Sequence, residues 1–163
     1  MANTTSVPTF AGAPALIAAL QRQQANALVM YLNYKKYHWN TYGPHFRDLH
    51  LLFDEHATAT IAELDEFAER ALMIEGQPLS DPSAYLPLAT VPLSSGEKSP
   101  RAAVEEAVEG ETRVIAEMHA DADEAARQGD IGTADLYTRL VQVHQKQRWF
   151  LSEVLKRNDG LGG

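Results

Sequence analysis

Apolar side chains recur along this chain at the three- and four-residue spacing of α-helices. One stripe runs from Ala15 to about Tyr42, and it comprises Leu16, Ile17, Leu20, Ala27, Leu28, Val29 and Leu32. A second stripe runs from Pro44 to Glu75, and it comprises Leu49, Leu52, Phe53, Ile61, Leu64, Phe67, Ala68, Ala71 and Leu72. Because Gly43-Pro44 ends one helix and starts another, the pattern predicts two long helices joined by a short turn. Gly76 is expected to close the second helix as its C′ residue.

Turn-forming residues divide the rest of the chain. Residues 77–99 contain four prolines, which predicts a long connection with a short helix in its middle, over 81–89. Ser99-Pro100 then supplies a helix N-cap and a favoured first helical residue. The third helix is expected to reach about Gln128, where GDIGT breaks it. A fourth helix is predicted from about Thr133 to Arg157.

Four helices with one long connection between the second and third have the wiring of a ferritin-like four-helix bundle. We therefore predict an all-α fold with one such domain over residues 15–157. A chain of 163 residues is long enough to bury a real core in one domain. Residues 1–14 are expected to form a flexible N-terminal tail, and residues 158–163 a short C-terminal tail.

Composition narrows the chemistry that this bundle can support. The chain has no cysteine, so any metal site must use nitrogen and oxygen ligands, which suits iron, manganese or zinc. Its net charge of −8 argues against a broad nucleic-acid-binding surface, and residues 1–21 carry no charged side chain. No run of about 18 apolar residues and no basic signal-peptide region is present. We therefore expect no membrane segment and a cytoplasmic protein.

The densest group of possible metal ligands is HWNTYGPHFRDLHLLFDEH, residues 38–56. His50 and Asp54 are four residues apart, so they lie one above the other on a helix. Asp65 and Glu69 form a second pair with the same spacing. The eleven residues from Asp54 to Asp65 make about three helical turns plus 20°, which puts both pairs on one stripe but about 16 Å apart. Metal–ligand distances are only about 2.0–2.2 Å, so one helix cannot bring both pairs to one ion.

His38 lies six residues before Pro44, and His50 lies six residues after it. A hairpin folded at this turn therefore places the two histidines side by side. One chain then offers an incomplete site of His38, His50 and Asp54, together with a separate carboxylate pair. A two-fold axis that runs the second helix antiparallel to its copy would complete two equivalent sites. A charged pair at helical spacing is more often a solvated surface, but two pairs in phase and a mirrored histidine favour a metal site.

The same residues resemble the signature of the Dps family, the miniferritins known as DNA-binding proteins from starved cells. The resemblance covers YHWNTYGPHFRDLHLLFDE and LDEFAERALMIEG closely, and TADLYTRL with QKQRWFL more loosely. It implies a dodecameric shell of four-helix subunits that oxidises Fe(II), preferably with hydrogen peroxide, and stores ferric mineral against oxidative stress. It also implies ferroxidase sites at two-fold interfaces, each binding up to two irons. By position, His38, His50 and Asp54 come from one subunit, and Asp65 and Glu69 come from its partner.

The resemblance also suggests roles for residues outside the ligand set. The tryptophan equivalent to Trp39 packs near the iron in the family and intercepts oxidising equivalents, although a plain packing role fits as well. Acidic residues line three-fold pores in the family, and the segment 117–130 supplies the pore candidates Glu117, Asp121 and Asp130. The usual reading of such an acidic segment is a solvated face.

The remaining histidines lie off the ligand stripe. His45 lies in the first turn of the second helix, and His56 is about 200° around that helix from Asp54, so both are expected at the surface or an interface. A supplementary metal site that involves one of them is the less favoured alternative. His119 and His144 stand isolated on the last two helices and are assigned no functional role.

Three other functions compete with this interpretation. A ferritin with its site inside one bundle needs Glu-x-x-His pairs, and none of the six histidines has a glutamate three residues before it. A nucleoid-structuring protein is disfavoured by charge, and because DNA-condensing relatives use basic tails, we expect weak or absent DNA binding. A shell that holds zinc or manganese without oxidase activity stays open, since zinc competes for the same ligands.

Overall fold

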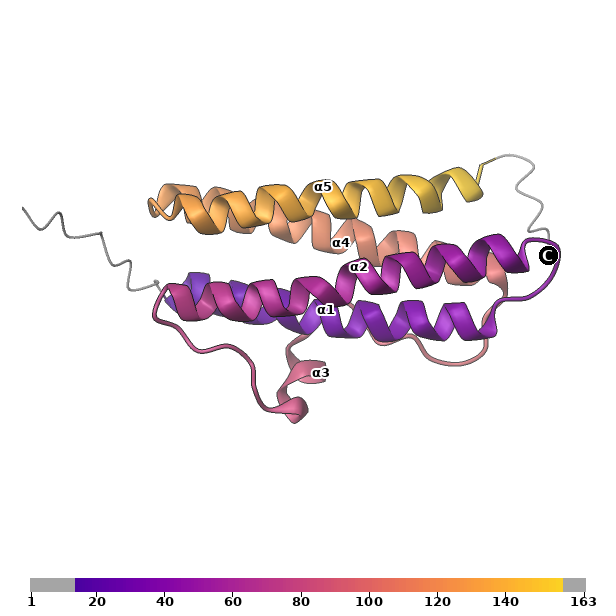
Figure 1. Cartoon of the computed structure of the whole chain (residues 1–163), viewed down its shortest axis with the longest axis horizontal. Coiled ribbons are helices and arrows are strands. Elements are labelled where there is room, and N and C mark those ends of the chain that lie inside the picture. Colours follow the sequence, from indigo (N-terminus) through magenta and orange to yellow (C-terminus); the bar gives the residue numbers. More distant parts are fainter. Residues whose placement is uncertain (1–13, 157–163) are drawn as a thin grey trace, which may run out of the picture.

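Two antiparallel helical hairpins stack on each other in the computed structural model, which describes residues 14–156 (Figure 1). The first hairpin pairs α1 (Pro14–Asn40) with α2 (Phe46–Met73), and the second pairs α4 (Pro100–Arg127) with α5 (Ile131–Val154). The connection between the hairpins carries a 3₁₀ turn, η1 (Pro82–Ala84), followed by the single-turn helix α3 (Tyr85–Leu88). It runs along α1 on the side away from α5 (Figure 1). No strand occurs among the described residues, so the predicted all-α four-helix bundle is confirmed.

The predicted helix boundaries agree with the structure to within about three residues wherever they can be compared. The last helix begins at Ile131, two residues before the predicted start, because Asp130 caps it by accepting hydrogen bonds from the backbone N–H and hydroxyl of Thr133. Its predicted end at Arg157 lies outside the described residues. So do the predicted tails, except that Pro14 already belongs to α1.

The core lies between the two hairpins, and its buried aromatic side chains come from α1, α2 and α5. The largest fully buried side chains are Tyr34, Tyr137, Phe53, Phe67, Leu20, Leu49, Ile74, Met118, Leu140 and Leu151, with His144 and Gln23 among them. Burying apolar surface of this kind is the main force that holds the helices together. No helix among residues 14–156 is long and apolar enough to cross a membrane.

Buried amide side chains on α1 fix the long connection in place. Asn26 Oδ1 accepts the backbone N–H groups of Thr90 at 2.8 Å and Val91 at 3.1 Å. Gln24 exchanges two hydrogen bonds with the backbone of Leu79, at 2.9 and 3.0 Å. Because this connection has little regular structure of its own, these amides satisfy backbone groups that would otherwise be buried without partners.

The end of α2 differs from the predicted C′ glycine. Glu75, not Gly76, adopts the left-handed backbone, with φ at 62°. The N–H of Gly76 bonds to the carbonyl of Ala71 at 2.8 Å, and that of Glu75 bonds to Leu72 at 3.0 Å, which is the Schellman pattern. Gly76 is instead required by close packing, because a Cβ there would lie 2.6 Å from Cγ1 of Ile17.

Replacing Glu75 with glycine is expected to stabilise the subunit by about 1 kcal/mol, because glycine adopts this backbone without a clash. A change of that size raises Tm by about 2–4 °C in a chain of this length. Gly76→Ala is the matched substitution in the opposite direction, and its Cβ should displace Ile17 and lower Tm. Calorimetry of the assembled protein measures both. A lower Tm for Glu75→Gly would contradict this account of the turn.

Candidate metal centre

The turn between α1 and α2 brings His38 and His50 into direct contact. Their rings stack with centroids 3.7 Å apart and planes 21° apart. Nδ1 of His38 lies 2.6 Å from the carbonyl oxygen of His50, and Nδ1 of His50 lies 2.9 Å from the carbonyl oxygen of His38. A carbonyl oxygen only accepts, so each Nδ1 must carry the hydrogen. In the neutral ring Nε2 is then left with its lone pair, as a metal ligand requires.

Asp54 lies one helical turn beyond His50 and carries a half-exposed carboxylate. Lys35 donates a 2.7 Å hydrogen bond to it from α1. This bond lowers the pKa of Asp54 below its usual value, and the nearby imidazoles of His38 and His50 act in the same direction. The carboxylate is therefore ionised at neutral pH, and a metal ion would have to replace Lys35 as its counterion.

The other predicted ligands, Asp65 and Glu69, are exposed on the same side of α2. Neither makes a hydrogen bond or ion pair with any residue from 14 to 156. Among these residues no three His, Asp or Glu side chains form a group that could hold a metal ion. Trp39 is 68 % exposed beside the histidine pair, with Lys35 Nζ 5.7 Å from its ring centroid. The structure thus brings His38 and His50 together near Asp54 and leaves Asp65 and Glu69 apart from them, and the role of all five as ligands stays a prediction.

A polar cluster that sequence reasoning missed lies in the middle of the bundle. Nε2 of His144 is 2.8 Å from Glu63 and Nδ1 is 2.7 Å from Glu111, and Tyr34 donates its hydroxyl to the other oxygen of Glu111. Burial disfavours the imidazolium, but the two carboxylates outweigh burial and raise the pKa of His144 to about 10. The interpretation of His144 as isolated is therefore wrong. The sequence did hold a signal for a buried carboxylate, because Glu63 stands four residues before Phe67 on the buried face of α2, but it held none for the partner of that carboxylate.

His56 also departs from expectation, because it is buried rather than at the surface. Because His56 is about 200° around the helix from Asp54, its side chain points into the bundle. There its ring lies edge-on to that of Tyr34, with centroids 5.4 Å apart. Burial, aided by the positive charge of His144, lowers the pKa of His56 to about 4. His56 is therefore neutral at pH 7, and its buried Nδ1 has no hydrogen-bond partner among the described residues.

The three pore candidates are all paired within their own subunit. Arg22 lies 2.6 Å from Asp121 and 3.4 Å from Glu117. Asp130, the cap of α5, is buried and lies 2.5 Å from Arg70. These contacts give each carboxylate a role in holding helices together, and the pore role stays a prediction.

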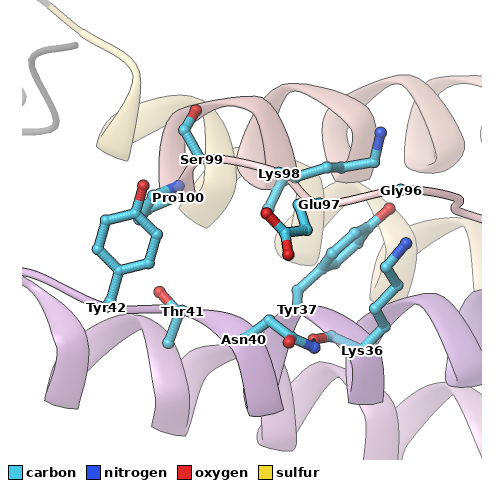
Figure 2. Close-up of a pocket in the computed structure, with 11 residues that line it drawn as sticks. Lys36, Tyr37, Asn40, Thr41, Tyr42, Gly96, Glu97, Lys98, Ser99 and Pro100 are labelled. Carbon is cyan, nitrogen blue, oxygen red and sulfur yellow. Dashed lines mark hydrogen bonds between the residues drawn. The ribbon is translucent and has the colours of Figure 1, made fainter.

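A cavity of about 410 Å³ opens between the end of α1 and the start of α4. Figure 2 shows Thr41 and Tyr42 on one side of it and Ser99 and Pro100 on the other, with the carboxylate of Glu97 directed inward. None of the predicted metal ligands lines this cavity. We assign it no part in the metal chemistry.

Comparison with known proteins agrees with the fold. The family described as ferritin-like domain matches residues 17–160. The X-ray structure of Dps from Thermosynechococcus elongatus has 58% sequence identity and a TM-score of 0.88, and the match covers 91% of this chain and 95% of that one. Dps from Vibrio cholerae O1, described as a member of a superfamily of ferritin-like diiron-carboxylate proteins, has 31% identity over 87% of this chain and 89% of its own, with a TM-score of 0.82. DNA protection during starvation protein 1 of Deinococcus radiodurans is 34% identical over 137 residues, which are 83% of this chain and 66% of the relative.

The four-helix bundle with one long connection thus defines a ferritin-like protein. Within that class, the chain belongs to the Dps family.

The buried imidazole of His144 should remain protonated well above neutral pH. Since its folded-state pKa of about 10 lies above the ordinary value of 6.5, its contribution to stability is complete below about pH 6.5. That contribution is lost as the pH rises through about 10. Solid-state NMR of ¹⁵N-histidine-labelled protein should show an imidazolium signal from His144 at pH 8. Only neutral imidazoles at pH 8 would contradict this assignment.

Proposed function

We propose that this protein is a miniferritin that oxidises Fe(II), preferably with hydrogen peroxide, and stores the ferric product inside a hollow dodecameric shell. Its reaction takes place at sites shared between two subunits. The observation that carries the proposal is the stacked pair of His38 and His50, whose mutual hydrogen bonds leave both Nε2 atoms available beside an ionised Asp54. The two histidines and Asp54, near the α1–α2 turn, need further ligands, and α2 carries towards its other end two carboxylates, Asp65 and Glu69, that pair with no residue from 14 to 156.

The positions along α2 support a two-fold arrangement. One midpoint, between Ala59 and Thr60, relates His50 to Glu69 and Asp54 to Asp65. An antiparallel copy of α2 centred there brings Asp65 and Glu69 of the second subunit opposite the histidine pair. The same operation builds an identical site at the other end, as a two-fold interface requires.

The exposed face of α2 suits such a contact. Near the midpoint it presents Thr58 and Ala62, whose small side chains permit two helices to approach closely. Towards the two ends it exposes Leu51 at 43 % and Leu72 at 54 %, apolar side chains that a partner would cover. The ligands therefore lie within a surface of interface character.

The ligand set fits the chemistry of iron as a substrate. Imidazole and carboxylate bind Fe(II) at neutral pH and remain compatible with Fe(III). Up to two Fe(II) ions at one site would give up one electron each to a single H₂O₂, which takes up two protons and leaves as two water molecules. Because both electrons arrive together, no hydroxyl radical is released. The exposed indole of Trp39 stands beside this site as a donor for stray oxidising equivalents.

A second candidate function uses the same ligands without oxidation. Zinc or manganese binds imidazole and carboxylate as well, so a metal-holding shell differs only in its reaction with iron. The Deinococcus relative is named for DNA protection. We still expect weak or absent DNA binding here, because the net charge is −8 and residues 1–21 carry no charged side chain.

Replacing Asp54 or Glu69 with alanine should abolish rapid iron oxidation, because each change removes a ligand from every site. After anaerobic loading with Fe(II) and a hydrogen peroxide pulse, the unaltered protein should oxidise about two Fe(II) per peroxide. Each variant should lose at least about tenfold in rate, towards the rate in buffer. Glu55→Ala is the matched control, since Glu55 is exposed next to Asp54 but about 100° around the helix.

Ferric absorbance and peroxide consumption measure the outcome. Unchanged rates in both ligand variants would refute the site assignment. If the unaltered protein oxidises iron no faster than buffer does, the metal-holding shell becomes the better description.

A further inference from the structure

Two buried carboxylates face each other inside the bundle, far from any solvent counterion. Glu63 comes from α2 and Glu111 from α4, and their side chains are 3% and 0% exposed. Carboxylates in such a place need a positive charge, because burying an unpaired anion is strongly unfavourable. Paired carboxylates on facing helices are also the group with which a four-helix bundle binds a divalent metal ion.

The ring of His144 fills the space between these carboxylates. Its two nitrogens lie 2.7 and 2.8 Å from Glu111 and Glu63. A neutral imidazole donates from one nitrogen only, so the lone pair on its other nitrogen would face a lone pair of a carboxylate oxygen. An imidazolium donates to both carboxylates and supplies the missing positive charge. Both nitrogens are then used, and His144 has no lone pair to offer a metal.

Among the described residues, the groups around the cluster supply a hydrogen-bond partner to Glu111 but not to the second oxygen of Glu63. Tyr34 donates to the second oxygen of Glu111. By contrast, Oε1 of Glu63, Oγ1 of Thr60 and Nδ1 of His56 are buried without a partner among residues 14–156. A cavity of about 270 Å³ between α2 and α5 is lined by His56. His56, Thr60 and Glu63 follow one another on α2 at four- and three-residue spacing, and the first of them also lines the cavity.

We propose that His144 determines where this protein binds metal, by occupying the place between Glu63 and Glu111 that a divalent cation would otherwise take. The ring acts as a built-in counterion, and it closes the bundle interior to iron. The arrangement agrees with the lack, among residues 14–156, of any three ligands placed to hold a metal. Iron is then left to the site between subunits, a last step that rests on the proposed function. The closure of the bundle interior does not rest on it.

The test removes the ring and asks whether metal enters. Asp54→Ala/Glu69→Ala serves as the background, so that the interface site contributes equally little to every sample. His144→Ala is added to it, and Co(II) is titrated anaerobically while visible d–d absorption and bound metal per subunit are recorded. The background should bind no Co(II) in the bundle, and His144→Ala should bind about one more ion per subunit. A matched control adds Glu63→Gln and Glu111→Gln to the His144→Ala protein and should lose that ion.

Two results would overturn the proposal. A background protein that already shows the bundle Co(II) signal, lost with the two glutamines, would make His144 a ligand rather than a block. A folded His144→Ala protein that binds no additional ion would show that the carboxylates do not attract metal.

If His144→Ala folds poorly by itself, Tm is measured with and without Co(II). The proposal requires Co(II) to raise the Tm of His144→Ala and to leave that of the background unchanged, and no rise at any Co(II) concentration would contradict it. Because all readouts are metal binding and stability in proteins that share the loss of Asp54 and Glu69, the result is independent of whether the ferroxidase proposal holds.

Discussion

The reciprocal hydrogen bonds between His38 and His50 connect the fold of this protein to its chemistry. Each ring donates to the backbone carbonyl of the other residue, so the α1–α2 turn and the ring orientations fix one another. This pairing sets which nitrogen of each ring is free, and it places both beside Asp54. The same pairing limits which ligands one chain can bring to this place, because Asp65 lies about 16 Å from Asp54 along the helix axis and Glu69 lies further still. Under the proposed function, a complete ligand set requires a second subunit, and assembly is then part of the active site.

The carboxylate of Asp54 and the buried pair of Glu63 and Glu111 have different counterions. We relate this difference to their proposed roles, metal binding for Asp54 and structure for the buried pair. Asp54 is paired with a lysine at a half-exposed position, where solvent and salt screen the interaction and a metal ion can replace it. Glu63 and Glu111 are paired with a histidine that is fully enclosed. Breaking that pair leaves uncompensated charge in the core, so it does not exchange readily. On our two proposals, the bundle interior is closed to metal while the α2 surface is open to it.

Local patterns were enough to predict the helices, the hairpin and the phase of the ligands. The apolar stripes place each helix to within a few residues, and the equal distances of His38 and His50 from Pro44 predict their contact. These features depend on residues close together in sequence, whose relation follows from helix geometry alone.

What the sequence did not reveal depends on how the two hairpins pack. The partners in the pair of Glu63 and His144 are 81 residues apart, and no local spacing announces their contact. The same holds for the ion pairs of Asp121 with Arg22 and of Asp130 with Arg70, which link helices that are far apart in the sequence. The left-handed Glu75 is a different case. Close packing against Ile17 requires glycine at position 76, and the residue before it, Glu75, adopts the left-handed backbone.

The central claim, a site shared between two subunits, is tested most directly with mixed shells. Subunits that carry Asp54→Ala are co-expressed with subunits that carry Glu69→Ala, and shells containing both are purified with two different tags. Random pairing makes half of the two-fold interfaces mixed, and each mixed interface has one intact site of two, so about a quarter of wild-type activity should return. If the ligands instead act within one chain, every subunit lacks one of them, and mixed shells that are as inactive as their parents would contradict the account.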